Sequence, residues 1–148
     1  MTLDVESTMA LAEDEPAVAT FLEEHGGRVD HSDVAVEDGI RWVSLHPRAE
    51  PQECFVARLA WSIYPHRPPS IAFCDGVGGP TNVMGAWPRI PGYRAPNDIC
   101  MPFTAEGFAL HPDWANGPNG WRPSPNPYLR VVTQLQDDLD YRCTGRCK

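Results

Sequence analysis

Four side chains between positions 97 and 113 are of types that support thiol chemistry. Cys100 stands in a stretch rich in proline and glycine, with Asn97 before it and His111 and Asp113 after it. A cysteine thiolate attacks carbonyl carbons when a base or a hydrogen-bond donor supports it. We expect His111, and after it Asn97, to stabilise the resulting oxyanion, and Asp113 to orient the imidazole. A small cysteine hydrolase is one protein class compatible with this group.

The other cysteines suit packing better than catalysis. The five thiols are odd in number and too sparse for a disulfide framework, which is typical of a reducing compartment and predicts a cytoplasmic protein. Cys54 begins one strand-like run and Cys74 ends another, as packing residues do. Cys143 and Cys147 have no neighbouring histidine that would complete a tetrahedral zinc site. Because the chain also lacks a glycine-rich phosphate loop, we expect neither a metal nor a cofactor.

Composition and charge limit the protein class further. The chain has 148 residues, 42% of them hydrophobic, which predicts one domain over 1–148 with flexible ends at 1–12 and 143–148. Its net charge of -8 argues against a nucleic-acid partner, because the phosphate backbone would be repelled. No apolar run approaches the roughly 20 residues of a membrane span, and the first residues are acidic, unlike a secretion signal. We therefore expect a soluble protein that is not exported and has no membrane partner.

The elements that position these side chains begin with a helix and a set of strands. Pro16 after two acidic residues favours a helix start and Gly26-Gly27 favours its end, so a helix is predicted from about 14 to 25. The strand-like runs that follow are VDHSDVAV (29–36), IRWVSLHP (40–47), CFVARLAW (54–61) and IAF (71–73). The first two are joined by Glu37-Asp38-Gly39, a hairpin signal. Successive strands with short links usually pair, which predicts a four-stranded antiparallel meander.

A long irregular segment separates the last strand from a final helix. Glycine, proline and asparagine recur between positions 75 and 125, yet the segment carries too many large aromatic side chains for a disordered linker. We expect it to be ordered and packed on the domain. A final helix is predicted from Asn126 as cap and Pro127 as first residue. Its apolar stripe, which we expect to face the sheet, consists of Tyr128, Val131, Val132, Leu135 and Leu139.

Three segments follow the motif order of a known family. Tyr64-Pro65, followed by Pro68-Pro69-Ser70-Ile71-Ala72-Phe73, has the form YPxxPPxVxF. Asp98-Ile99-Cys100-Met101 is similar to a G-x-I-C-L segment around an active-site cysteine. Trp121-Arg122-Pro123 and the following helix are similar to a W-x-P element and its helix. Over about residues 14 to 142 the chain resembles ubiquitin-conjugating enzymes, in particular the divergent bacterial relatives of ubiquitin-like conjugation and phage-defence operons.

The resemblance implies a fold, an activity and partners. The fold is the UBC-like α+β fold: an N-terminal helix, the four-stranded meander, a long ordered active-site loop and a C-terminal helix packed on the sheet. The activity is acyl transfer. An adenylating enzyme delivers a ubiquitin-like protein, which Cys100 carries as a thioester and passes to a protein or other amine substrate. Antiviral defence in the cytoplasm is the implied setting.

The chain also departs from the family's pattern. The family's His-Pro-Asn tripeptide has no match here: Gly92-Tyr93 lie near its place, and Ala95-Pro96-Asn97 lie too close to Cys100 to align. Some bacterial relatives are said to carry a histidine near the cysteine instead, which implies His111. The first helix is acidic, where the family's is basic and contacts the activating enzyme, so the partner surface must differ. The missing tripeptide leaves a second hypothesis open, a catalytically inactive binding scaffold of the same fold.

Overall fold

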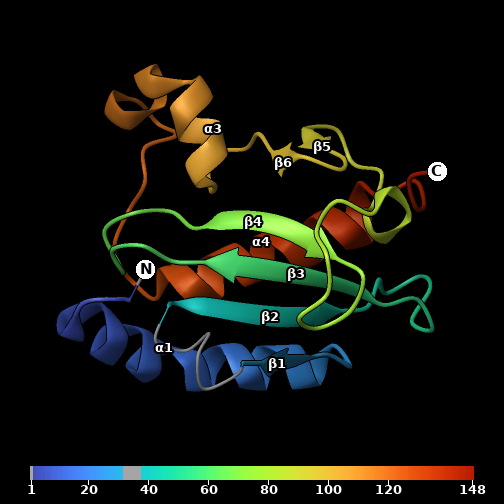
Figure 1. The fold of residues 1–148 in the computed structure, drawn as a ribbon, viewed down its shortest axis with the longest axis horizontal. Helices are drawn as coiled ribbons and strands as arrows, with labels where there is room; N and C mark the ends of the chain where they lie inside the picture. The colour runs from blue at the N-terminus through green and yellow to red at the C-terminus, as the bar shows by residue number, and fades with distance from the viewer. Residues whose placement is uncertain (1, 32–37) are drawn as a thin grey trace.

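A four-stranded antiparallel sheet forms the centre of the fold. The computed structural model describes residues 2–31 and 38–148. The strands lie side by side in chain order (Figure 1): β1 (Arg28–Asp30), β2 (Ile40–Leu45), β3 (Phe55–Ala60) and β4 (Ser70–Cys74). The predicted meander is confirmed for these strands. Most of the expected first strand, and Glu37 of the expected hairpin turn, lie outside the described residues.

The face of the sheet that is turned away from the viewer in Figure 1 is covered by helix α4 (Pro127–Tyr141). Alternate residues of β3, namely Phe55, Ala57 and Leu59, are at most 2% exposed, as are Ile71 and Phe73 of β4. Side chains of a strand alternate between two faces, so these residues share the covered face. Burial of such apolar side chains is the main stabilising contribution to the fold.

Helix α4 follows its prediction closely. The Asn126 side chain caps it by accepting from the backbone N–H of Leu129 at 2.9 Å, and Pro127 is its first residue. The predicted stripe is buried, with Tyr128, Val132 and Leu135 fully inaccessible. Within the described residues, none of the helices is both long and apolar enough to cross a lipid bilayer.

Helix α1 (Val5–Glu24) begins earlier than the predicted helix of residues 14 to 25. Asp4 caps it by accepting from the backbone N–H of Ser7 at 2.8 Å, and Pro16 lies inside it. The residues that α1 buries are spaced at helical intervals: Ser7, Leu11, Val18 and Leu22. The Pro16 signal for a helix start was therefore wrong here, and residues 5–12 belong to α1 instead of forming a flexible end.

The segment between β4 and α4 consists of short elements along the β4 edge of the sheet (Figure 1). They are η1 (Met84–Ala86), β5 (Tyr93–Arg94), β6 (Asp98–Ile99), α3 (Ala105–Leu110) and η2 (Pro112–Asn116). As expected, most of its large side chains pack on the domain core. Phe108 and Trp114 are in ring contact with each other instead. Trp87 and Tyr93 are buried, and Phe103 and Trp121 are partly buried against the same core. The pairing of β5 with β6 and the helix α3 were not predicted.

The C-terminal residues 143–148, expected to be flexible, are held against residues 85–89. Backbone hydrogen bonds run from Cys147 N–H to the Trp87 carbonyl at 2.9 Å and from Arg89 N–H to the Gly145 carbonyl at 2.8 Å. The Arg146 side chain donates to Glu53, to the Gly85 carbonyl and, at 2.7 Å, to the Cys54 carbonyl. The guanidinium also lies 4.1 Å from the centre of the Phe55 ring. These contacts hold in place a terminus that was expected from the sequence to be flexible.

Replacing Arg146 with alanine should lower the free energy of unfolding by about 1–2 kcal/mol, because charge-assisted hydrogen bonds and a cation–π contact are lost at a partly exposed site. Urea unfolding followed by tryptophan fluorescence measures this. Arg67→Ala is the matched control, since that exposed side chain has no hydrogen-bond or ion-pair partner among the described residues. Equal destabilisation by the two variants would show that the tail contacts contribute nothing specific.

Candidate active site

Cys100 lies at the end of a small hairpin. Strands β5 and β6 pair with Tyr93 opposite Ile99 and Arg94 opposite Asp98. The backbone N–H of Cys100 donates to the Gly92 carbonyl at 2.8 Å, which extends the same ladder by one pair. Because side chains alternate between the two faces of a hairpin, Cys100 shares a face with Arg94 and Asp98. The thiol is partly exposed there, as a nucleophile that meets a large substrate must be.

The opposite face of the hairpin is anchored to α4. Tyr93 and Ile99 are buried, and the Tyr93 hydroxyl donates to the Asp138 carboxylate at 2.6 Å. Asp138 is 1% exposed and also accepts from the Gln134 side chain at 2.9 Å. Burial first, and then the Asp138 charge, raises the pKa of Tyr93 well above its usual value. The hydroxyl therefore stays protonated, and the hairpin has one fixed attachment to the helix behind it.

The turn that follows Cys100 is fixed by Thr104. This fully buried hydroxyl donates to the Ile99 carbonyl at 2.5 Å, lies 3.1 Å from the Met101 carbonyl, and accepts from the backbone N–H of Gly107 at 3.0 Å. Gly107 lies so close to the backbone that a Cβ atom there would be 2.1 Å from the Met101 carbonyl oxygen. The first turn of α3 thus packs directly on the backbone next to Cys100, which limits its movement.

The charged groups closest to Cys100 in the hairpin are Arg94 and Asp98. The Arg94 guanidinium donates through two nitrogens to the two Asp98 carboxylate oxygens, each at 2.6 Å. The pKa of Arg94 is raised, first by this hydrogen bonding to Asp98, then by the Asp98 charge, and last by an electrostatic interaction with Cys100. Sequence reasoning missed both residues. Opposite charges on the two sides of an Ala-Pro-Asn turn were the available signal.

The three partners expected for Cys100 make no direct contact with its side chain in the described part of the chain. His111 ends α3 and stacks on the Trp114 ring, with centroids 4.3 Å apart and planes inclined by 15°. Asp113 is exposed in η2, and Asn97 is exposed in the turn between β5 and β6. Across residues 2–31 and 38–148, no hydrogen bond, ion pair or ring contact joins any of the three to the Cys100 side chain. The thiol, imidazole and carboxylate therefore do not form a preassembled catalytic group.

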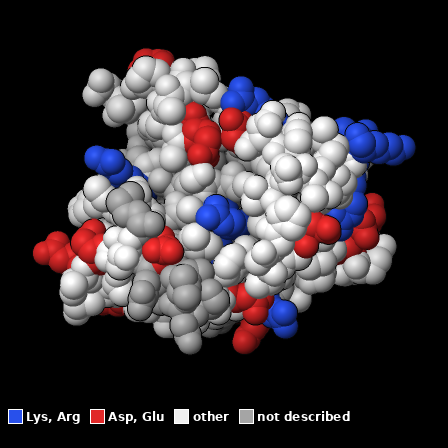
Figure 2. Space-filling view, viewed as in Figure 1, with Lys and Arg blue, Asp and Glu red and all other residues white. Residues whose placement is uncertain are grey.

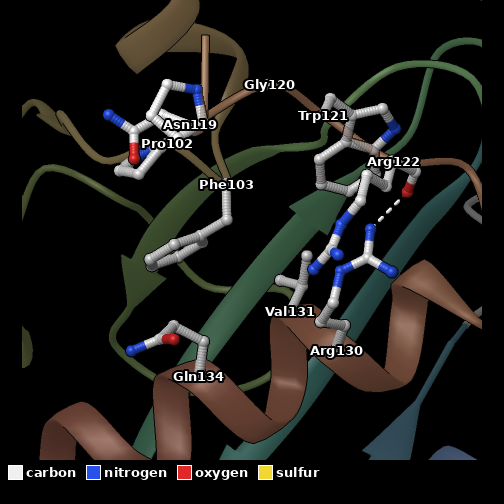
Figure 3. A pocket seen from close by; sticks show the side chains of 10 residues that line it. Pro102, Phe103, Asn119, Gly120, Trp121, Arg122, Arg130, Val131 and Gln134 are labelled. Carbon is white, nitrogen blue, oxygen red and sulfur yellow. Dashed lines mark hydrogen bonds between the residues drawn. The ribbon is translucent and has the colours of Figure 1, made fainter. Parts of the chain in front are cut away.

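A hollow of about 210 Å³ opens beside the Cys100 turn (Figure 3). Pro102 and Phe103, which follow Cys100 closely in the chain, line one side, and Trp121 and Arg130 line another. The Arg130 guanidinium lies 5.3 Å from the Trp121 ring centre and donates to the Arg122 carbonyl. Burial is the main cause that lowers the pKa of Arg130. The hollow combines aromatic surface with two arginines on a chain whose net charge is -8.

The remaining cysteines have packing or backbone contacts. Cys74 is 3% exposed, and burial raises the pKa of its thiol. The thiol of Cys143 accepts from the Gly145 N–H at 3.4 Å, and that of Cys147 lies 3.7 Å from the Pro88 carbonyl. All five cysteines are free, and in the described part of the chain no three His, Cys, Asp or Glu side chains are grouped to hold a metal ion.

Comparisons with protein-family models, with curated proteins and with solved structures found nothing that matches this chain. The structure shows an α+β architecture, which consists of an N-terminal helix, a four-stranded antiparallel sheet and a C-terminal helix.

Proposed function

We propose that this protein is a transferase of the ubiquitin-conjugating type, which carries a ubiquitin-like protein as a thioester on Cys100 and passes it to an amine. The observation that carries the proposal is the setting of Cys100. Its thiol is partly exposed, its hairpin is attached to α4 through Tyr93, and its turn is held by Thr104. A rigid, accessible thiol beside a positive charge suits repeated acylation and release.

Hydrogen bonds and packing contacts link the three motif segments of the resemblance to one another, which supports the proposal. The Trp121 indole N–H donates to the Pro65 carbonyl at 2.9 Å, joining the W-x-P element to the Tyr-Pro segment. The backbone N–H of Ala105, at the start of α3, donates to the Pro69 carbonyl at 2.9 Å. Because α3 also packs against Met101, the proline segment is connected to the Cys100 turn through α3. Motifs that are distant in sequence thus share one neighbourhood.

The proposed reaction needs a partner that supplies an activated carbonyl. An adenylating enzyme would deliver the ubiquitin-like protein as a thioester, and the Cys100 thiolate would attack its carbonyl carbon and expel the donor's thiolate. In the second step an amine nitrogen attacks, the Cys100 sulfur leaves, and the amine loses a proton. Acidic side chains are visible at the left of Figure 2, where Figure 1 places the first turns of α1. We infer a basic complementary surface on the activating enzyme.

Intact mass spectrometry without reductant tests the proposal directly. The protein is incubated with ATP and with the ubiquitin-like protein and activating enzyme encoded nearest to it. Wild-type protein should gain the mass of one ubiquitin-like protein minus water, and dithiothreitol should remove it. Cys100→Ala should form no adduct, whereas Cys54→Ala, which alters another partly buried thiol, should be charged normally. An adduct on Cys100→Ala, or none on the wild type with partners shown to be active, would contradict the proposal.

The supply of lysines predicts where the protein can modify itself. Lys148 is the one lysine among its 148 residues, whereas arginine occurs eleven times. If the proposed transfer uses lysine amines, Lys148 is the side chain within these 148 residues that self-modification would use. We expect Lys148→Arg to abolish every lysine-linked self-adduct, detected by peptide mass spectrometry, and to leave charging of Cys100 unchanged. Persistence of such an adduct, or a loss of charging, would be inconsistent with this expectation.

A non-catalytic binding scaffold is the second candidate, and one observation favours it. No amide or imidazole side chain among residues 2–31 and 38–148 is hydrogen-bonded to Cys100. A scaffold would bind a ubiquitin-like protein without any reducible adduct. The hydrolase hypothesis receives no support from the geometry, because the His111 ring is stacked on Trp114 instead of contacting the thiol.

A further inference from the structure

Arg94 lies on the same face of the β5–β6 hairpin as Cys100. The pairs Arg94–Asp98 and Gly92–Cys100 are two residues apart along the hairpin, so their side chains stand on one face. Diagonal neighbours on such a face are within reach of a long side chain. Gly92 has no side chain to stand between Arg94 and the thiol. The electrostatic interaction between Arg94 and Cys100 agrees with this placement.

The Arg94 guanidinium is both oriented and partly unoccupied. Asp98 accepts from its Nε and from one Nη2 hydrogen, which fixes the plane of the group. A guanidinium has five N–H donors, and in the described part of the chain the Nη1 nitrogen of Arg94 has no hydrogen-bond partner. Gly92, near the place expected for the missing asparagine, supplies no side-chain donor. Asp98 therefore fixes the orientation of the Arg94 side chain, and the Nη1 group remains available to donate hydrogen bonds on the face of the hairpin that carries Cys100.

We propose that Arg94 is a catalytic residue that stabilises the oxyanion formed when Cys100 takes up or releases an acyl group, and that Asp98 positions it. The inference rests on the proposed acyl transfer at Cys100. When the thiolate attacks, a C–S bond forms and the carbonyl electron pair moves to oxygen. Arg94 donates hydrogen bonds to that oxygen and stays protonated throughout. Collapse restores the carbonyl and expels the leaving group.

Two reagents that use the same thiolate separate this role from thiol reactivity in general. p-Nitrophenyl acetate acetylates a cysteine through a tetrahedral oxyanion and releases p-nitrophenolate. Iodoacetamide alkylates it by displacement of iodide, without an oxyanion. Peptide mass spectrometry gives the rate at Cys100, with Cys54 in the same molecule as an internal reference. Neither reagent needs the ubiquitin-like protein or an activating enzyme.

Arg94→Ala should slow acetylation of Cys100 by about tenfold or more beyond any slowing of its alkylation, since removing one oxyanion donor typically costs that much or more, whereas loss of the neighbouring positive charge affects both reactions through the same thiolate. Arg94→Lys should recover part of the rate, and Asp98→Asn should lose part of it. Because Arg94 is about half exposed, these variants should fold. Equal slowing of both reactions, no slowing of either, or no acetylation of wild-type Cys100 would overturn the proposal.

The outcome is independent of the charging experiment. A wild-type adduct together with no Arg94 effect would leave Cys100 as the carrier and dismiss Arg94. If Arg94→Ala slows acetylation but the wild type forms no adduct with the ubiquitin-like protein, the oxyanion role of Arg94 would be supported and the proposed transfer of a ubiquitin-like protein would be contradicted.

Discussion

Raising the pH above 10 is expected to destabilise this protein by about 4 kcal/mol per pH unit. Burial first, and neighbouring carboxylates next, raise the pKa of Tyr64, Tyr93 and Tyr128 above their usual value. In the unfolded chain these phenols ionise near pH 10, whereas in the folded protein they stay protonated. The unfolded state therefore holds fewer protons, and stability falls by up to about 1.4 kcal/mol per tyrosine per pH unit.

This loss is a large part of the free energy of unfolding, because a typical domain is stable by only about 5–15 kcal/mol. The contribution of the three tyrosines is fully present below pH 10 and is lost as the pH rises beyond it. Urea unfolding between pH 8 and pH 11.5 measures the slope. Tyr93→Phe should reduce the slope by about a third, while Tyr141→Phe, which alters an exposed tyrosine, should not change it. A flat stability profile above pH 10 would contradict the expectation.

Replacing Asp138 with alanine should cost about 2–4 kcal/mol and loosen the hairpin that carries Cys100. The substitution leaves the buried Tyr93 hydroxyl without its acceptor and removes the Gln134 contact and an ion pair with Arg142 at 3.6 Å. An unsatisfied buried group costs about 1–3 kcal/mol, and hydrogen bonds to a charged partner are worth more than neutral ones. The free energy of unfolding from urea titration measures the total effect.

Asp137 provides the matched control for this prediction, since it is the adjacent residue of α4 and is exposed. Asp137→Ala should change stability by less than about 0.5 kcal/mol. A double-mutant cycle with Tyr93→Phe isolates the coupling between the hydroxyl and the carboxylate. Additive effects of Asp138→Ala and Tyr93→Phe would show that the hairpin is not attached through this pair.

Sequence patterns predicted the elements whose burial follows a simple period. The α4 stripe and the alternation in β3 and β4 were correct because the positions predicted to face inward are apolar and buried. The start of α1 was misplaced for the opposite reason. Ser7 occupies a core position of its first turn, where its hydroxyl accepts from the Tyr64 N–H at 3.0 Å and donates to Asp4 at 2.8 Å. A polar residue that is satisfied by a partner 57 positions away breaks the apolar pattern.

The candidate site, too, could be predicted from the sequence only in part. Cys100 could be singled out from a motif, and the hairpin that presents it depends on short strands that lack an extended period. Arg94 becomes a neighbour of Cys100 through the pairing register, which no strand-like period in this stretch of sequence indicates. His111 was favoured because of its chemical type, but its ring finds an aromatic partner three residues away. The type of a residue suggests which reaction it could support, whereas the pairing register of the strands determines which residues are neighbours.

The contacts between α1 and α4 join the two ends of the chain. The Asn126 side chain donates to the Asp14 carbonyl across 112 residues, and the Tyr128 hydroxyl donates to Glu15 across 113. Translation proceeds at about 5–20 residues per second, so α1 waits on the order of 10 seconds for its partner helix to be synthesised. During that interval the apolar side of α1 lacks its final cover. We therefore expect this protein to be more prone to aggregation as a nascent chain on the ribosome than as the folded domain.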